Sequence, residues 1–197
     1  MANWAITDYV IEGPKDTLKK IEEAIKHPKV EEGSSENWEG NVLHTLGFEW
    51  ESRKPDGTGK YMRGFIGEGV EPYYDNNNVL IFSAQEAYGV TDFNEVLEEN
   101  LPDIKIFYRT EEPDNLIYAT NDVEGKYFPD RFYVDTCING NYAGDYFKDE
   151  ESMWIWLAKV SNGQVKNQKD VEHFNENAEV NDYIEVNSFE VIDNHKS

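Results

Sequence analysis

The chain has 197 residues, of which 40 are acidic and 18 are basic, and its formal net charge is −22. So negative a chain is not expected to bind nucleic acid directly, or an anionic membrane, through phosphate contacts. The charge permits a basic protein partner or a cation, and solubility alone is the interpretation that we favour. Hydrophobic residues make up 39% of the sequence and aromatic residues 14%, so the composition is that of a folded chain.

Cysteine content and the first residues bear on the cellular compartment. The single cysteine, Cys137, excludes an intrachain disulfide and suits a reducing environment. The opening MANWAITDYV lacks the basic and apolar regions of a signal peptide, and no apolar run approaches the ~20 residues that span a bilayer. We expect a cytoplasmic protein with a single domain over residues 1–197.

The first part of the chain predicts a strand, two helices and a second strand. Residues 4–11 alternate as a strand does, and Gly13-Pro14 then begins a helix that ends before Pro28. Residues 42–46 suit a short helix ending at Gly47. Residues 61–70 predict a strand bent at a glycine, and the turn at 75–78 predicts a hairpin to the following strand.

The central stretch predicts a split βαβ unit. Residues 79–82 suit a buried strand, and Asp92 with Glu95 has the spacing of a capping box. An apolar stripe that includes Leu97 follows, and residues 104–108 resume as a strand. A strand, a crossover helix and an aligned strand make the unit on which the rest of the fold is organised.

Further elements are expected after this unit. Strands are predicted at 116–120, at 131–138 and at 183–192, with a turn at 139–141. Asp149 is a candidate cap for a helix over 150–160, and a weaker helix is expected over 170–178. The run Met153-Trp154-Ile155-Trp156-Leu157 is too apolar for one stripe, so we expect two covered faces on the first of these helices.

The predicted order is that of an α+β fold with a ferredoxin-like βαββαβ antiparallel sheet as its core, over about residues 1–125. Strands and helices of a C-terminal extension, about 126–197, are added to this core. The segments that resemble a known family are Met1-Ala2-Asn3-Trp4, Gly13-Pro14, Ala87-Tyr88, Leu101-Pro102, Ile104-Lys105-Ile106, Tyr108, Glu111-Glu112-Pro113 and Asn121-Asp122.

These segments resemble the Api92-like proteins with a YubB-type ferredoxin-like domain, which occur in bacteria, plasmids and phages. The resemblance covers roughly residues 1–125 and implies a mobile-element protein without an assigned activity. Two features differ: Ala5 stands where the family has a cysteine, and a Gly-Thr-Lys-Trp motif is missing around residues 61–71.

No motif in the sequence predicts catalysis, a metal or a cofactor. The histidines His27, His44, His173 and His195 have no zinc-ligand spacing with one another or with Cys137, and we expect that cysteine to be buried and unreactive. The glycine pairs Gly57/Gly59 and Gly67/Gly69 lack the lysine of a phosphate loop.

Two features allow alternatives. The turn at 121–125 suits a weakly bound calcium or, as we favour, a plain β-turn. Trp154 and Trp156 suit ligand stacking or, as we favour, core packing.

The acidity is concentrated after residue 60, where 28 acidic and 10 basic residues give −18. The candidate interaction patch is formed by Glu98, Glu99, Asp103, Glu111, Glu112 and Asp114. Glu98 and Glu99 stand at a predicted helix C-terminus, where carboxylates oppose the helix dipole. A sequence selected for stability alone has little reason to keep them there, which favours a role in binding.

Three functional hypotheses follow. The leading one is a non-enzymatic cytoplasmic protein of unknown function that acts through protein contacts. The first alternative is an acidic decoy that mimics nucleic acid against a basic DNA-binding partner, and it requires carboxylates at near-phosphate spacing. The second is a hydrolase-type enzyme with an acid–base carboxylate in a cleft. The sequence does not decide whether the chain is an enzyme, and the absence of catalytic motifs favours the first hypothesis.

Overall fold

The computed structural model describes residues 3–67, 69–73 and 78–193. Helices and two β-sheets give the α+β class that the sequence predicts. The chain divides into two compact units, Met1–Asn121 (unit 1) and Asp122–Ser197 (unit 2), close to the expected boundary between core and extension. We expected a single domain. Each of the two units instead has a hydrophobic cluster of its own.

Unit 1 is built on an antiparallel sheet with β1 (Trp4–Glu12) at its centre. β1 pairs with β4 (Val79–Ala87) on one side and with β5 (Lys105–Glu112) on the other. β6 (Ile117–Thr120) pairs with β5, while β2 (Gly64–Ile66) and β3 (Glu71–Tyr73) pair with β4. Because β4 and β5 are both antiparallel to β1, they run in the same direction with β1 between them, as a split βαβ unit requires.

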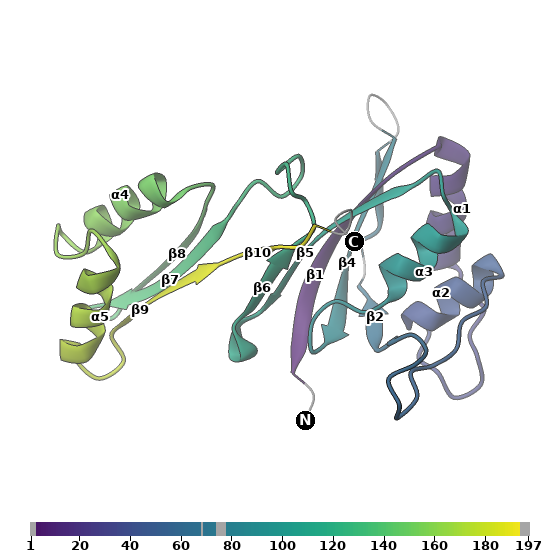
Figure 1. Ribbon diagram of the computed structural model, residues 1–197, viewed down its shortest axis with the longest axis horizontal. Helices are drawn as coiled ribbons and strands as arrows, with labels where there is room; N and C mark the ends of the chain where they lie inside the picture. The colour runs from purple at the N-terminus through teal and green to yellow at the C-terminus, as the bar shows by residue number, and fades with distance from the viewer. Residues whose placement is uncertain (1–2, 68, 74–77, 194–197) are drawn as a thin grey trace. The chain divides into compact units, whose positions relative to one another are not determined.

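Three helices cover one face of this sheet (Figure 1): α1 (Lys15–Lys26), α2 (Glu39–Leu46) and α3 (Phe93–Asn100). α2 ends at Gly47, whose φ of 81° is the left-handed conformation that glycine adopts most readily. A 3₁₀ turn, η1 (Pro113–Asn115), lies between β5 and β6. The predicted helices are confirmed here.

The core of unit 1 forms between the helices and the inward-facing residues of the central strands. Tyr9 and Phe82 stack in it with ring centroids 5.0 Å apart, and Phe93 of α3 packs edge-on against both rings. Leu97 is fully buried in the same cluster, which confirms the predicted apolar stripe of α3.

The predicted capping box of α3 is wrong. Asp92 makes no side-chain bond to the first turn of the helix; its Oδ2 accepts a 2.6 Å hydrogen bond from the backbone N–H of Tyr61 instead. Glu95 pairs with Lys60 Nζ at 3.0 Å. Both carboxylates therefore hold the segment before β2, a tertiary contact that outweighs the local cap.

The predicted strand over 61–70 is shorter than expected. Among the described residues of this range only β2 is formed, and β3 follows as a separate short strand beyond Val70. The predicted hairpin turn at 75–78 falls almost wholly outside the described residues.

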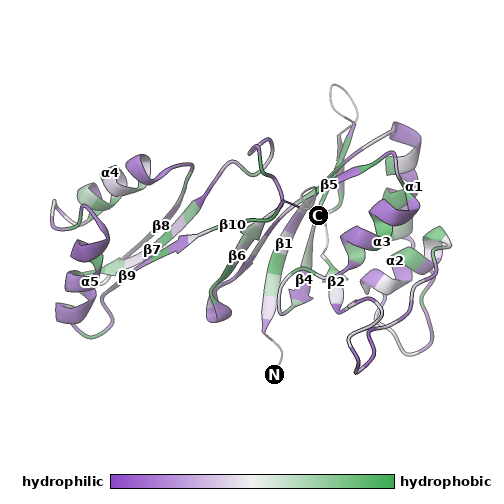
Figure 2. Ribbon diagram, in the orientation of Figure 1, coloured by the Kyte–Doolittle hydropathy of each residue, from purple (hydrophilic) through white to green (hydrophobic). Residues whose placement is uncertain are grey.

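Unit 2 has a three-stranded antiparallel sheet with β7 (Phe132–Ile138) between β8 (Asn141–Phe147) and β9 (Tyr183–Ser188). β8 was not predicted. Helices α4 (Glu150–Val160) and α5 (Gln168–Asn177) pack against the sheet, and a short strand, β10 (Glu190–Val191), follows β9. In Figure 2 α5 is mostly hydrophilic, consistent with Val171 as its buried residue.

The predicted cap of α4 is confirmed, because Asp149 accepts a 2.8 Å hydrogen bond from the backbone N–H of Ser152. The expectation of two covered faces on this helix is wrong. Met153 and Leu157 are buried against the sheet, but the side chain of Ile155 is 65% exposed. α4 is thus a one-sided helix with an apolar residue left on its outer face.

Candidate functional site

The sheet of unit 2 has two faces of different chemistry. Val134, Ile138, Phe147 and Ile184 project to one side, where they pack with buried residues of α4 and α5. Because side chains alternate along a strand, the residues between them project to the opposite face. That face carries a set of polar and aromatic side chains that we call the tyrosine face: Tyr133, Asp135, Tyr142, Tyr146, Tyr183 and Glu185.

Strand register brings these residues together. Tyr133 of β7 stands opposite Tyr146 of β8, and their ring centroids are 4.8 Å apart. Asp135 stands opposite Gly144 of β8 and opposite Glu185 of β9. The face therefore has two carboxylates at its middle and tyrosines around them.

One carboxylate oxygen of this face is held by the neighbouring strand. The hydroxyl of Tyr183 donates a 2.8 Å hydrogen bond to Asp135 Oδ2, and this bond raises the pKa of Tyr183 to about 12. Asp135 Oδ1 extends over β8, since a Cβ on Gly144 would meet it at 3.6 Å and the Tyr133 hydroxyl at 3.1 Å. The glycine leaves space for both polar groups over the strand.

The tyrosine face is partly exposed, and the strands that form it carry carboxylates but no basic side chain. The side chain of Tyr142 is 74% exposed and that of Tyr146 is 37% exposed. β7, β8 and β9 contain no lysine or arginine. Tyrosine rings attract cations through their faces, and carboxylates attract them by charge, so this arrangement suits a guanidinium or ammonium group.

Unit 1 contains a second unusual group, a pair of carboxyls in its core. Glu39 begins α2, Glu86 lies near the end of β4, and both side chains are fully buried. Glu86 Oε1 accepts hydrogen bonds from the Tyr9 hydroxyl at 2.7 Å and from the Thr91 backbone N–H at 3.1 Å. The Thr91 hydroxyl lies 2.9 Å from that atom and 2.8 Å from Glu39 Oε2.

Small neighbours make room for this pair. Glu86 stands between Ala5 of β1 and Gly64 of β2 in the sheet register. A Cβ on Gly64 would overlap the carboxyl of Glu39, so that carboxyl packs directly against the strand backbone. No local pattern in the sequence marks this pair, because Glu39 and Glu86 are 47 positions apart and the packing of α2 against the sheet brings them together.

Burial favours a proton on this pair of carboxyls. Glu39 Oε1 and Glu86 Oε2 are buried and find no donor among the described residues as long as both carboxyls are ionised. Burial first, and then the charge of Glu86 and a hydrogen bond with it, raise the pKa of Glu39 well above its usual range; the bond from Thr91 lowers it. A proton on Glu39 would give Glu86 Oε2 a hydrogen-bond donor.

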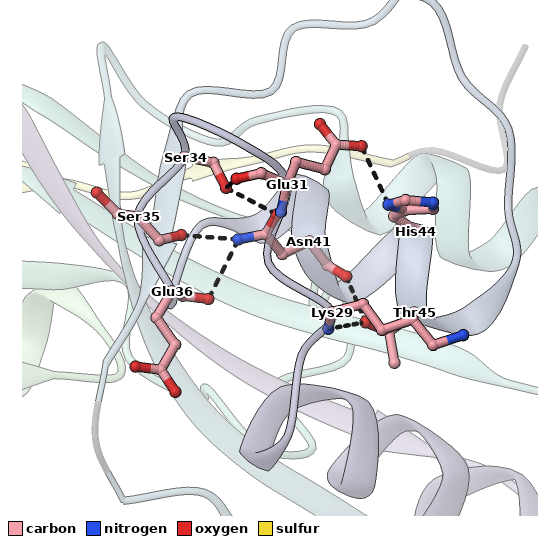
Figure 3. A network of polar contacts seen from close by, with 8 residues as sticks. All are labelled: Lys29, Glu31, Ser34, Ser35, Glu36, Asn41, His44 and Thr45. Carbon is pink, nitrogen blue, oxygen red and sulfur yellow. Dashed lines mark hydrogen bonds and ion pairs between the residues drawn. The ribbon is translucent and has the colours of Figure 1, made fainter.

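A polar network fixes the start of α2 and with it Glu39 (Figure 3). The buried side chain of Asn41 accepts 3.0 Å hydrogen bonds from the backbone of Glu31 and from the hydroxyl of Ser34. The Thr45 hydroxyl donates to the backbone of Asn41 and accepts from the backbone of Lys29, each at 2.7 Å. The preceding loop is thus tied to the helix at several points.

Glu39 and Glu86 have no exposed surface. Three surface hollows lie along α1, α2 and the segments beside them, and neither carboxyl lines any of these. Glu39 has a raised pKa, as a catalytic acid does, but its side chain is fully buried in unit 1.

The predicted acidic patch is only partly a surface feature. Glu98 is half-buried, and its Oε1 accepts a 2.9 Å hydrogen bond from the backbone N–H of Ile106. Glu99 forms an ion pair with Lys60 at 2.7 Å. Both carboxylates at the end of α3 therefore have structural partners, so their unfavourable position on the helix dipole is not evidence for binding.

The remaining patch residues differ in exposure. Asp103 and Asp114 are exposed. Glu111 is half-buried and pairs with Arg109 at 3.2 Å. Glu112 is buried and accepts a hydrogen bond from Asn115, so it is not part of the surface. Whether the exposed members bind a partner stays a prediction.

The other candidates from the sequence have structural surroundings. Cys137 is buried and free, as predicted. Asp122, in the turn considered for calcium, is buried and accepts hydrogen bonds from the backbone of Tyr127 and Phe128. Trp154 and Trp156 are partly buried against the core of unit 2.

Within the ranges that the structure describes, no group of three or more His, Cys, Asp or Glu side chains is placed to hold a metal ion. Over the same ranges, no helix is long and apolar enough to cross a membrane. Comparison of the chain with protein-family models, with curated proteins and with solved structures gives no match.

Proposed function

We propose that the chain is a non-enzymatic interaction protein and that its tyrosine face binds a basic segment of a partner protein. The observation that carries this proposal is the group of four tyrosines around Asp135 and Glu185, of which Tyr142 and Tyr146 are exposed, on strands without a basic residue. Tyrosine contributes a large contact area at low entropic cost and is enriched at protein interfaces. The net charge of −22 favours approach of a basic partner from a distance.

The two alternatives have less support. A hydrolase would need an acid–base carboxylate in an accessible cleft, whereas Glu39, the carboxyl with a raised pKa, is enclosed. A nucleic-acid decoy would need aligned surface carboxylates, whereas Glu112 is buried and Glu98 and Glu99 are bonded within unit 1. The decoy hypothesis and our proposal both require a basic partner, but they place that partner on different surfaces of the protein.

We propose a ferredoxin-like fold for unit 1. The order β5-β1-β4-β2, antiparallel throughout and with helices after the first and third of the main strands, supports this. Membership of the Api92-like family, a mobile-element origin and a cytoplasmic location stay proposals, the last supported by the unpaired Cys137.

The test is a binding titration with a labelled peptide in which arginine alternates with threonine, and with a second peptide in which glutamate replaces arginine. The arginine peptide is expected to bind, and more weakly as salt rises. Glu185→Gln and Tyr142→Ala should each weaken binding about two- to fivefold, the size expected of one exposed ion pair or cation–π contact.

The matched control is Glu179→Gln, which removes the same charge from an exposed position outside the tyrosine face. Its affinity should remain close to that of the unaltered protein. Equal weakening by Glu179→Gln and Glu185→Gln would show attraction by net charge alone and would contradict the proposal. Weakening by Asp103→Asn with Asp114→Asn, and none by Glu185→Gln, would favour the predicted acidic patch.

A further inference from the structure

The two edges of the unit 2 sheet differ in how their backbone is satisfied. On β9 the side-chain amide of Asn175, from α5, accepts a 2.9 Å hydrogen bond from the Ile184 N–H and donates a 2.8 Å bond to the Ile184 carbonyl. An amide that donates and accepts in this way occupies the place of a neighbouring strand. The β9 edge is therefore blocked at this residue.

The β8 edge is open at two residues, Tyr142 and Gly144. β7 and β8 are joined by a tight turn at Asn139-Gly140, where both φ angles are positive (52° and 73°), as a two-residue type I′ hairpin requires. Alternate residues of such a hairpin direct their backbone groups away from the partner strand, and on β8 these are Tyr142, Gly144 and Tyr146. Asp145 Oδ1 accepts the N–H of Tyr146 at 2.9 Å. Among the described residues, nothing bonds the outward backbone groups of Tyr142 and Gly144.

β8 has one charged residue, Asp145, whose carboxylate occupies the N–H of Tyr146, and it otherwise lacks the devices that usually protect an edge strand. It contains no lysine or proline, and its register with β7 runs from Ile138↔Asn141 to Phe132↔Phe147 without a bulge. Natural proteins use such features to prevent unwanted strand pairing. β8 has no lysine, proline or bulge, whereas the β9 edge is blocked at Ile184. The outer edge of β8 is therefore the one that can pair with a further strand.

We propose that an extended basic segment of a partner protein adds as a strand to the outer edge of β8. This inference rests on the proposed function and specifies how the segment is held. Main-chain hydrogen bonds to Tyr142 and Gly144 would supply affinity, and alternate side chains would supply specificity. An arginine or lysine opposite Gly144 would cross that glycine between Tyr142 and Tyr146 to reach Asp135 Oδ1.

The negative charge near the β8 edge favours a basic segment over an acidic one. The two carboxylates of the tyrosine face and the charge of −22 disfavour pairing with a second copy of the chain. An arginine or lysine of the added strand would form an ion pair with Asp135 or Glu185, whereas an acidic side chain at the same place would be repelled.

The test compares Tyr142→Pro with Tyr142→Ala, using the arginine–threonine peptide as the probe. Both variants lose the tyrosine ring, but only proline also removes the outward N–H, and proline is tolerated on an edge strand where that N–H faces solvent. Binding to Tyr142→Pro should be about tenfold weaker than to Tyr142→Ala. In the unaltered protein the peptide should slow hydrogen exchange at the amides of Tyr142 and Gly144.

Equal affinity of the two variants, with no added protection at Tyr142 and Gly144, would overturn strand addition. The proposed function would survive that result if Glu185→Gln still weakened binding more than Glu179→Gln. Retained exchange protection across β7 and β9 checks that Tyr142→Pro is folded. Sedimentation without peptide could also show a dimer that is lost in Tyr142→Pro. That result would show that a second copy of the chain pairs with the β8 edge, and it would overturn the proposal that a basic segment of a partner protein does so.

Discussion

Replacing Glu39 by glutamine should change how the stability of unit 1 depends on pH. The folded protein keeps the proton of Glu39 over a pH range in which the unfolded chain has lost it, because burial and Glu86 raise the pKa of this carboxyl. Its stabilising contribution is fully present below the ordinary pKa of 4.5 and is lost as the pH rises toward the folded-state value.

The magnitude follows from proton linkage. Across that range the unaltered protein should lose about 1.4 kcal/mol of stability per pH unit through this group. Glutamine carries no titrating proton, and its amide can donate to Glu86 Oε2. The Glu39→Gln variant should therefore gain stability relative to the unaltered protein as the pH rises above the ordinary pKa of 4.5, with that slope until the folded-state pKa of Glu39 is reached.

The assay is urea denaturation at a series of pH values, with hydrogen exchange of peptides from β1 and β4 to assign the transition to unit 1. Glu32→Gln, at an exposed position, is the control and should leave the pH profile unchanged. A stability difference between Glu39→Gln and the unaltered protein that stays constant with pH would refute the shared proton.

Three other substitutions or reagents test the packing. Leu97→Ala should destabilise unit 1 by about 2–5 kcal/mol in urea denaturation, since the side chain is fully buried, and an unchanged midpoint would contradict the predicted α3 stripe. Gly64→Ala should lower thermal stability because its methyl group would overlap the Glu39 carboxyl; no change would mean that the pair has room to move. A thiol reagent should label Cys137 slowly until the protein unfolds, and fast labelling of the native protein would contradict its burial.

Much of unit 1 could be predicted because its signals are local. The apolar run beginning at Val79, the stripe around Leu97 and the glycine at Gly47 each specify one element, and all three are confirmed. The cap at Asp92 failed because a distant backbone group, the N–H of Tyr61, competes for its carboxylate. Contacts of that kind have no local signature.

The candidate site was missed for a different reason. β8 has a single buried residue, Phe147, so it lacks the hydrophobic run that marks a strand. The signal that was available is the Asn-Gly turn followed by tyrosines at 142 and 146, on one face by the period of two. What sequence could not give is the pairing of Asp135 with Gly144 and Glu185, which depends on register across three strands.

The most direct test of the proposed function is to locate the arginine–threonine peptide on the protein by NMR. Amide and ring signals of an isotopically labelled sample would be followed during titration with the peptide. The largest shifts are expected at Tyr142, Gly144, Tyr146 and Tyr183, with unit 1 unaffected. Shifts centred on Asp103 and Asp114 of unit 1, or spread evenly over the acidic surface, would contradict binding at the tyrosine face.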